Sequence, residues 1–147
     1  MNDLNKFGEW YHEIRMPDGR LTESYIAKYC RTQWETTRSV LEKVDYRGTS
    51  VLDLGSMDGM WAFLAERRGA THVVASDVYQ GVSNWNPFRR MLVAREELKS
   101  NILILTECSA ENLVDRTVNI RRTIGKKFDI IHNLGVMYHV LNPMKIL

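Results

Sequence analysis

The sequence lacks several features that mark particular classes of protein. Its two cysteines, Cys30 and Cys108, are too few and too far apart for a disulfide framework or a four-ligand zinc site. No stretch approaches the roughly 20 apolar residues that a membrane-spanning helix needs, and the first residues show no basic start followed by an apolar run. We therefore expect a protein of the cytoplasm, without a membrane partner.

The chain also lacks an excess of charge of one sign. Its 20 basic and 18 acidic residues are interspersed and give a formal net charge of +2, so no uniform positive field argues for nucleic acid. With 147 residues, 44% of them apolar, the composition is that of one folded globular domain. A chain of this length can build one hydrophobic core but not two.

Strands and helices are predicted to alternate after residue 48. Helices are expected at residues 60–68, 87–99 and 110–124 and from Met137 onward. Strands joined by helical crossovers lie parallel, which defines a doubly wound, Rossmann-like α/β fold. The strands are four short apolar runs that lack polar alternation and are therefore expected to be buried on both faces: Val51–Leu54, His72–Ala75, Ile102–Leu105 and Phe128–Ile131.

Residues 1–47 form an appendage to a core domain at residues 48–147. The turn Pro17-Asp18-Gly19 after Trp10–Arg15 is typical of a hairpin or extended arm. We expect this arm, and the helix that follows it, to pack on the core or to cover its ligand. The helix is predicted between residues 23 and 44 from apolar residues that recur every three or four positions: Tyr25, Ile26, Tyr29, Cys30, Trp34, Leu41 and Val44.

A turn rich in glycine and aspartate, Asp-Leu-Gly-Ser-Met-Asp-Gly, follows the first predicted strand, where parallel sheets bind their ligands. Gly55 allows an unusual backbone conformation and Gly59 a close approach between helix and sheet. Met57 stands where a dinucleotide-binding turn needs its second glycine. Asp53 and Asp58 would repel a diphosphate, but they favour a ligand that carries an ammonium and a sulfonium group. S-adenosylmethionine is such a ligand.

The segments after the other predicted strands are polar as well. Asp77 lies 18 residues after Gly59, where a carboxylate can accept hydrogen bonds from both hydroxyls of a ribose. The third segment, residues 106–113, is placed to meet an adenine edge. The fourth, residues 132–139, is placed to close the site beside the methyl group. The predicted cofactor site contains Asp53, Gly55, Ser56, Met57, Asp58, Gly59, Asp77, Val78, Ser109, Ala110, Glu111, Asn133 and Leu134.

The segments VLDLGSMDG, VVASD, CSAENL and FDIIHNLGVMYHVLNP resemble, in this order, the motifs of class I S-adenosylmethionine-dependent methyltransferases. Met57 departs from the glycine that is common at its position. In that family the sheet continues through three more strands, so we expect a sheet that ends early and an open edge covered by a second copy or a partner chain. The resemblance implies that Asp53 and Gly55 contact the methionyl part and that Asp77 contacts the ribose. It also implies that Ser109 and Ala110 contact the adenine and that Asn133 and Leu134 face the acceptor.

A narrower resemblance concerns the segments WYHEIRMPDGRLT, MDGMWAFLAERRGA and GVMYHVLNP, which look like the group of tRNA wobble-uridine methyltransferases and carboxymethyltransferases. It implies that Tyr138 lies at the transferable group. If the acceptor is a hydroxyl, His139 or His12 can take its proton, although His139 at a helix start can equally just bond a turn. The methyl acceptor, a tRNA base or a small molecule, stays open.

Other interpretations remain at this stage. Asp53 can cap backbone donors of the turn, and Asp58 can cap the following helix. The chain can also be a catalytically silent module that binds S-adenosylmethionine and needs a partner to complete its sheet. A nicotinamide-dependent oxidoreductase is disfavoured by Met57 and by the acidic turn. No metal site is expected. Trp61 and Phe63 are predicted to be core residues, and Trp85 to cover the sheet edge.

Overall fold

The computed structural model describes residues 4, 8–78, 87–109, 112–125, 127–136 and 139. Within these residues the strands form one parallel sheet in the order β3-β2-β1-β4. Its strands are β1 (Ser50–Leu54), β2 (His72–Ser76), β3 (Leu103–Leu105) and β4 (Ile130–Asn133). The helices are α1 (Ala27–Leu41), α2 (Met60–Arg67), α3 (Pro87–Glu97) and α4 (Leu113–Ile124).

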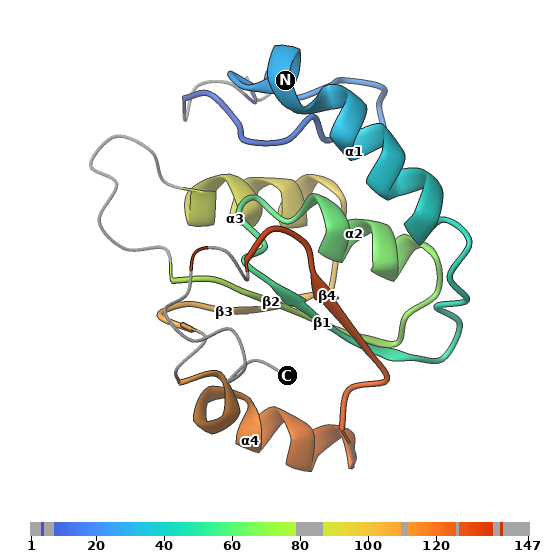
Figure 1. Ribbon diagram of the computed structural model, residues 1–147, viewed down its shortest axis with the longest axis vertical. Helices are drawn as coiled ribbons and strands as arrows, with labels where there is room; N and C mark the ends of the chain where they lie inside the picture. Colours follow the sequence, from blue (N-terminus) through green and yellow to red (C-terminus); the bar gives the residue numbers. More distant parts are fainter. Residues whose placement is uncertain are drawn as a thin grey trace.

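The sheet lies between two layers of helices. In Figure 1, α1, α2 and α3 lie on one side of the sheet and α4 lies on the other. This arrangement confirms the doubly wound α/β fold that the alternating pattern predicts. Within the described part of the chain, no helix is long and apolar enough to cross a membrane.

The two faces of the sheet have separate cores. Val51 and Val73 contribute to the larger core, toward the first three helices, whereas Leu52 and Val74 contribute to the smaller one, toward α4. This alternation follows from the period of two in a strand. In α2, Phe63 and Trp61 are buried, as predicted. Burying a side chain of this size stabilises a fold by about 1.5–3 kcal/mol.

The expected burial on both faces holds for β1 and, apart from the exposed His72, for β2, but is wrong for the outer strands. Leu103 of β3 is 45% exposed and Ile131 of β4 is 53% exposed. Both strands are edges of this sheet, and each has one strand neighbour among the described residues. The apolar composition of a strand does not say whether the strand lies at the centre or at an edge.

The fourth strand begins two residues later than predicted. Asp129 precedes it, and its carboxylate accepts hydrogen bonds from both the backbone N–H and the hydroxyl of Ser50, each at 2.8 Å. Because this side chain bonds the start of β1, regular pairing begins only at Ile130. As a result, His132 and Asn133 lie inside the strand and not in the turn after it.

The first helix is shorter than predicted, and its apolar stripe is only partly buried. Trp34 and Leu41 are buried, but Tyr29 is 75% exposed. The helix starts late because Ser24 bonds the arm, donating from its hydroxyl to the backbone oxygen of Tyr11 at 2.5 Å. The helix expected from Met137, like the predicted place of Trp85, lies outside the described residues.

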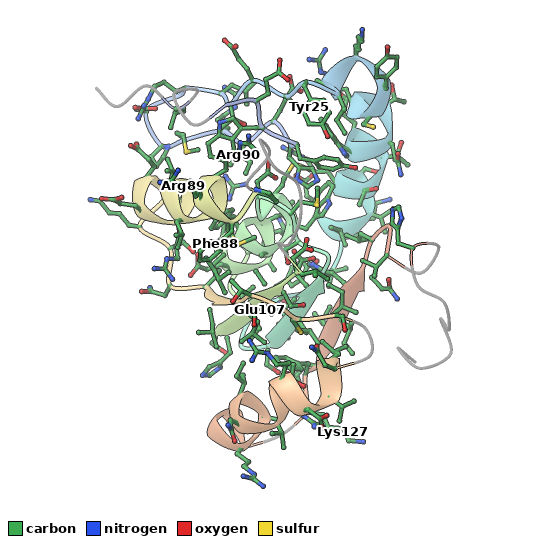
Figure 2. The ribbon with its side chains drawn as sticks, turned by 90° about the vertical axis from the view of Figure 1, so that its left-hand side faces the viewer. Tyr25, Phe88, Arg89, Arg90, Glu107 and Lys127 are labelled. Atoms are coloured by element: carbon green, nitrogen blue, oxygen red, sulfur yellow. The ribbon has the colours of Figure 1, made fainter. Side chains whose placement is uncertain are left out.

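The N-terminal arm forms the predicted hairpin. Met16 and Arg20 pair through their backbones at 2.8 Å, and Gly19 adopts a left-handed conformation with φ +89°. The Arg20 side chain reaches α3, where it donates to Glu97 at 2.6 Å. Figure 2 places Tyr25 close to Arg90 of α3, on the side of that helix where the arm lies. The arm therefore packs on the core domain, while its role as a cofactor lid stays a prediction.

Candidate functional site

The turn between β1 and α2, residues 55–59, is called the glycine turn below. Gly55, Met57 and Gly59 have φ values of +63°, +55° and +91°. A side chain in this left-handed region costs about 1–2 kcal/mol, which is the physical reason why a glycine suits the position of Met57. A Cβ atom on Gly59 would lie 2.7 Å from Phe63 of α2 and 3.2 Å from Met91 of α3. Gly59 thus allows a close approach, as predicted, but its near neighbours belong to the helices α2 and α3 and not to the sheet.

Ser56 fastens the glycine turn to β2. Its hydroxyl donates to the backbone oxygen of Asp53 at 2.8 Å and accepts from the N–H of Ser76 at 3.0 Å. The backbone N–H of Ser56 donates to the Ser76 carbonyl at 3.1 Å. Because the side chain is also buried, Ser56 acts here as a bond within the fold, and its predicted cofactor contact stays untested.

Asp77, at the carboxyl end of β2, bridges to the glycine turn. Its Oδ2 atom accepts a hydrogen bond from the N–H of Met57 at 2.9 Å, and its Oδ1 atom accepts one from Val78 at 2.7 Å. Each carboxylate oxygen can accept a second bond. A partly exposed carboxylate held over the turn can therefore receive a ribose hydroxyl, as predicted from its spacing. Val78 is 41% exposed.

Asp53 is buried within β1, with an exposure of 1%. Its Oδ1 atom lies 3.4 Å from Nδ1 of His132 on β4. The described residues offer no hydrogen-bond donor to its Oδ2 atom, so the alternative that Asp53 caps backbone donors does not account for that oxygen. A buried oxygen without a hydrogen-bond donor raises the free energy of the fold. Such an oxygen attracts a cation or a water molecule.

Asp58 bonds the N-terminal arm in this structure, and its predicted cofactor contact stays a prediction. It is completely buried, and its carboxylate accepts from the backbone N–H of Tyr11 at 2.7 Å, from that of His12 at 3.0 Å and from the His12 ring at 2.5 Å. The start of α2 has no side-chain cap. Asp58 therefore ties the arm to the glycine turn. The His12 ring is engaged in this hydrogen bond, and its predicted role as a base stays a prediction.

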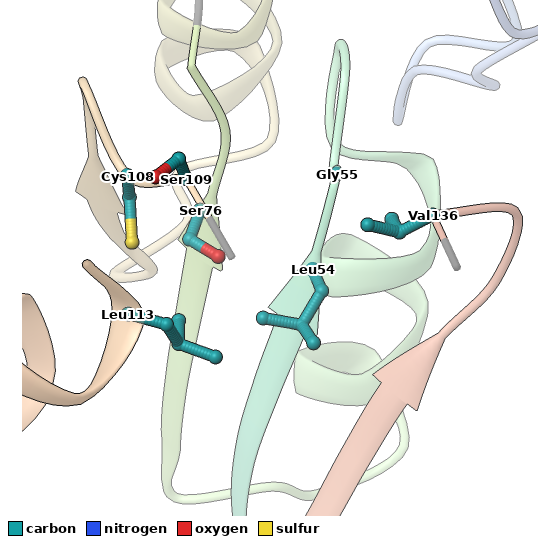
Figure 3. A pocket seen from close by; sticks show the side chains of 7 residues that line it. All are labelled: Leu54, Gly55, Ser76, Cys108, Ser109, Leu113 and Val136. Atoms are coloured by element: carbon teal, nitrogen blue, oxygen red, sulfur yellow. The ribbon is translucent and has the colours of Figure 1, made fainter. Parts of the chain in front are cut away.

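Figure 3 shows the pocket that lies beside the glycine turn, at the carboxyl ends of β1 and β2. Its cavity volume is about 30 Å³, far below the roughly 300–1,000 Å³ of typical small-molecule sites, so side chains must move before a cofactor can enter. A Cβ atom on Gly55 would collide with Val136, so Val136 fills the space next to this glycine. The lining residues are Leu54, Gly55, Ser76, Cys108, Ser109, Leu113 and Val136.

The third predicted segment contributes Ser109 to the pocket wall. Ser109 and Asn112 bond each other before α4: the backbone N–H of Ser109 donates to the Asn112 side chain at 2.9 Å. Beside it, burial raises the pKa of the Cys108 thiol, so this wall of the pocket is neutral. Ala110 and Glu111 lie outside the described residues, and their predicted contacts with adenine stay predictions.

The fourth predicted segment is only partly described. Asn133 is half-buried, and no described residue bonds its Oδ1 atom. Leu134 is 36% exposed. His139 is exposed, and its backbone N–H donates to Val136 at 2.9 Å. Tyr138 lies outside the described residues, so the catalytic roles predicted for Tyr138 and His139 stay predictions.

Sequence reasoning missed two groups of residues at this site. Tyr46 donates or accepts a hydrogen bond with Nε2 of His132 at 2.8 Å, across 86 positions of sequence. No local pattern connects these residues, because their contact depends on β4 lying beside β1. Val136 and Cys108 also line the pocket unpredicted, although each lies inside one of the segments that the sequence singles out.

A glycine turn flanked by acidic strand ends, on a doubly wound parallel sheet, defines a nucleoside-binding α/β domain. Comparison with known families refines this class. Residues 26–147 match the methyltransferase domain family, and the chain therefore belongs to that family. This finding confirms the resemblance to methyltransferases seen in the four ordered segments.

Two individual proteins illustrate the similarity. The chain is 33% identical over 104 residues to the tRNA U34 carboxymethyltransferase of Campylobacter hominis, a match that covers 71% of this chain and 32% of that relative. It thus spans about a third of the length of the curated relative. The crystal structure of EvdMO1 superposes with a TM-score of 0.59 and 19% identity, covering 97% of this chain and 30% of that one. This second likeness shows the fold.

Proposed function

We propose that the chain binds S-adenosylmethionine at the glycine turn and transfers a methyl group from it to an acceptor. The observation that carries the proposal is the pair of carboxylates near the glycine turn, Asp53 inside β1 and Asp77 directly after β2. Asp77 suits the ribose hydroxyls, and Asp53 the positive charge of the methionyl part. The cofactor would supply an electrophilic methyl group. The protein would hold its two ends and exclude water.

The residues present fit this cofactor better than a nicotinamide dinucleotide. The pocket lining contains no lysine or arginine among the described residues, so nothing there would neutralise a diphosphate. The neutral thiol of Cys108 and the side chains of Leu54 and Leu113 suit an uncharged ring. Val136 must shift for a ligand to rest on Gly55, since it packs directly against that glycine.

Calorimetric titration of the purified chain tests this proposal. We expect S-adenosylhomocysteine and S-adenosylmethionine to bind and NAD not to bind at comparable concentrations. Tighter binding of NAD would overturn the assignment in favour of an oxidoreductase. Methyl transfer by the bound protein would separate an enzyme from the alternative, a silent module that binds S-adenosylmethionine and regulates a partner.

The acceptor is a separate proposal. The Campylobacter hominis relative is named for U34 of tRNA, which makes a wobble uridine the first acceptor to test with this chain. Transfer of a methyl group and of a carboxymethyl group can be told apart by the mass of the product nucleoside. A small-molecule acceptor is the other candidate, and the expected location in the cytoplasm suits both.

We also propose that another chain covers the outer edge of β4. Among the described residues β4 pairs with β1 alone, and Ile131 on this strand is 53% exposed. Open strand edges with apolar side chains are prone to pairing. We expect light scattering to give a mass above the 17.1 kDa of one chain, and Ile131→Lys to lower it. A mass of 17.1 kDa at high concentration would exclude a second copy as the covering chain.

A further inference from the structure

Three buried polar side chains lie in a row behind the glycine turn. Asp53 of β1 and His132 of β4 are directly opposite each other in the sheet register. Tyr46, from the segment before β1, contacts the far side of the histidine. The exposures of Asp53, His132 and Tyr46 are 1%, 3% and 1%. Polar groups removed from water to this degree are costly unless they serve one another or a ligand.

The Asp53 carboxylate only accepts hydrogen bonds, so it favours the tautomer of His132 that carries its hydrogen on the facing Nδ1 atom. Burial, followed by the charge of Asp53, raises the pKa of Tyr46 to about 12, so the phenol keeps its proton near neutral pH. The Tyr46 hydroxyl can then donate to Nε2 of His132, 2.8 Å away. A neutral imidazole that accepts at Nε2 carries its own hydrogen on Nδ1. This hydrogen faces the Asp53 carboxylate, with Nδ1 3.4 Å from Oδ1.

The Asp53 carboxylate is held in position but has unused bonding capacity. Its backbone oxygen accepts hydrogen bonds from the hydroxyls of Ser56 at 2.8 Å and Ser76 at 3.1 Å, which fastens this residue to the turn and to β2. The separation of 3.4 Å from His132 is longer than a normal hydrogen bond. Because its Oδ2 atom has no donor among the described residues, the carboxylate keeps most of its capacity to attract a cation.

We propose that Tyr46 and His132 are positioning residues that orient the Asp53 carboxylate so that it attracts the ammonium group of the methionyl part of S-adenosylmethionine. This inference rests on the proposed function. The attraction acts from behind the glycine turn, because Asp53 does not line the pocket itself. Opposite charges attract each other more strongly where water is excluded than in bulk water.

The test compares two ligands that differ in the proposed contact. S-adenosylhomocysteine carries the ammonium group, whereas 5′-methylthioadenosine has the same adenosine and thioether but no amino-acid part. We expect His132→Leu to raise the dissociation constant of S-adenosylhomocysteine about tenfold, because the Asp53 carboxylate loses the imidazole that orients it. The constant for 5′-methylthioadenosine should change less than about twofold, because this ligand lacks the ammonium group.

Two further variants separate positioning from simple core packing. His132→Asn places an amide N–H near the position of Nδ1 and should restore most of the affinity for S-adenosylhomocysteine. Tyr46→Phe removes only the hydroxyl and should weaken the same ligand alone, by about threefold. His72→Leu is the matched control, since His72 is exposed at the start of β2, and it should change neither constant.

The outcomes distinguish this inference from the proposed function. If the wild-type chain binds neither ligand, the proposed function fails and the inference fails with it. If the wild type binds both ligands and the variants weaken both equally, or weaken neither, the cofactor site stands and the positioning role is wrong. Thermal melting checks that each variant is folded. If His132→Leu does not fold, His132→Asn and Tyr46→Phe still give the comparison.

Discussion

Replacing Asp77 with asparagine is expected to weaken the binding of S-adenosylhomocysteine by about 1–3 kcal/mol. The amide oxygen of asparagine can still accept from the N–H of Met57, which Asp77 bonds at 2.9 Å, so the glycine turn should keep its shape, whereas the N–H of Val78 loses the acceptor it has at 2.7 Å. The charge that strengthens hydrogen bonds from the two ribose hydroxyls is lost. Calorimetric titration of the folded variant measures the change.

Asp45→Asn is the matched control for this substitution. Asp45 is an exposed aspartate that bonds Arg47 in the segment before β1, and it has no part in the pocket. Its replacement should leave the binding curve unchanged. Equal affinities for the wild type, the Asp77 variant and the control would remove Asp77 from the cofactor site.

Asp58→Ala is expected to lower the free energy of unfolding by about 3–5 kcal/mol, because each buried donor left without its acceptor costs about 1–3 kcal/mol. The substitution leaves the His12 ring without its carboxylate partner and two backbone N–H groups, those of Tyr11 and His12, without their acceptor. Each group is buried or nearly so. Urea denaturation measures the loss, and faster tryptic cleavage after Arg15 or Arg20 would report that the arm has detached.

Asp18→Ala tests whether the effect belongs to Asp58 and not to the arm in general. Asp18 lies in the exposed turn of the same hairpin, where it bonds Arg20. Surface substitutions of this kind have small effects, so the denaturation midpoint should stay close to that of the wild type. Similar midpoints for the Asp58 and Asp18 variants would contradict the role of Asp58 in holding the arm.

The centre of the sheet was predictable because strands that are covered on both faces have apolar residues without alternation. Runs such as Val51–Leu54 are apolar without alternation, and helices cover both faces of this strand. The same apolar composition gave a wrong prediction of burial for Ile131, which is exposed because its strand β4 lies at an edge of the sheet. The end of a strand depends on contacts such as that of Asp129 with Ser50, which no local pattern reveals.

Among the acidic residues of the candidate site, the sequence predicts the place of Asp77 but not the bonding partners of Asp58. Asp77 follows β2 directly, as the sequence predicts, and its carboxylate bonds the glycine turn, while its predicted contact with ribose stays a prediction. For Asp58, the sequence offers two roles, a cofactor contact and a helix cap, and the structure shows a third. Its partners Tyr11 and His12 are 46–47 positions away, so only the docked arm could disclose them.

The sequence by itself determined the parallel α/β architecture, the place of the glycine turn and the acidic ends of β1 and β2, because each depends on residue type and spacing along a single strand or turn. Only the tertiary structure decided which carboxylates stay available. It engages Asp58 with the arm and leaves Asp53 beside His132 with an oxygen that no described residue bonds. The physical reason is that hydrogen-bond partners of buried charges come from distant segments, and packing alone brings these segments together.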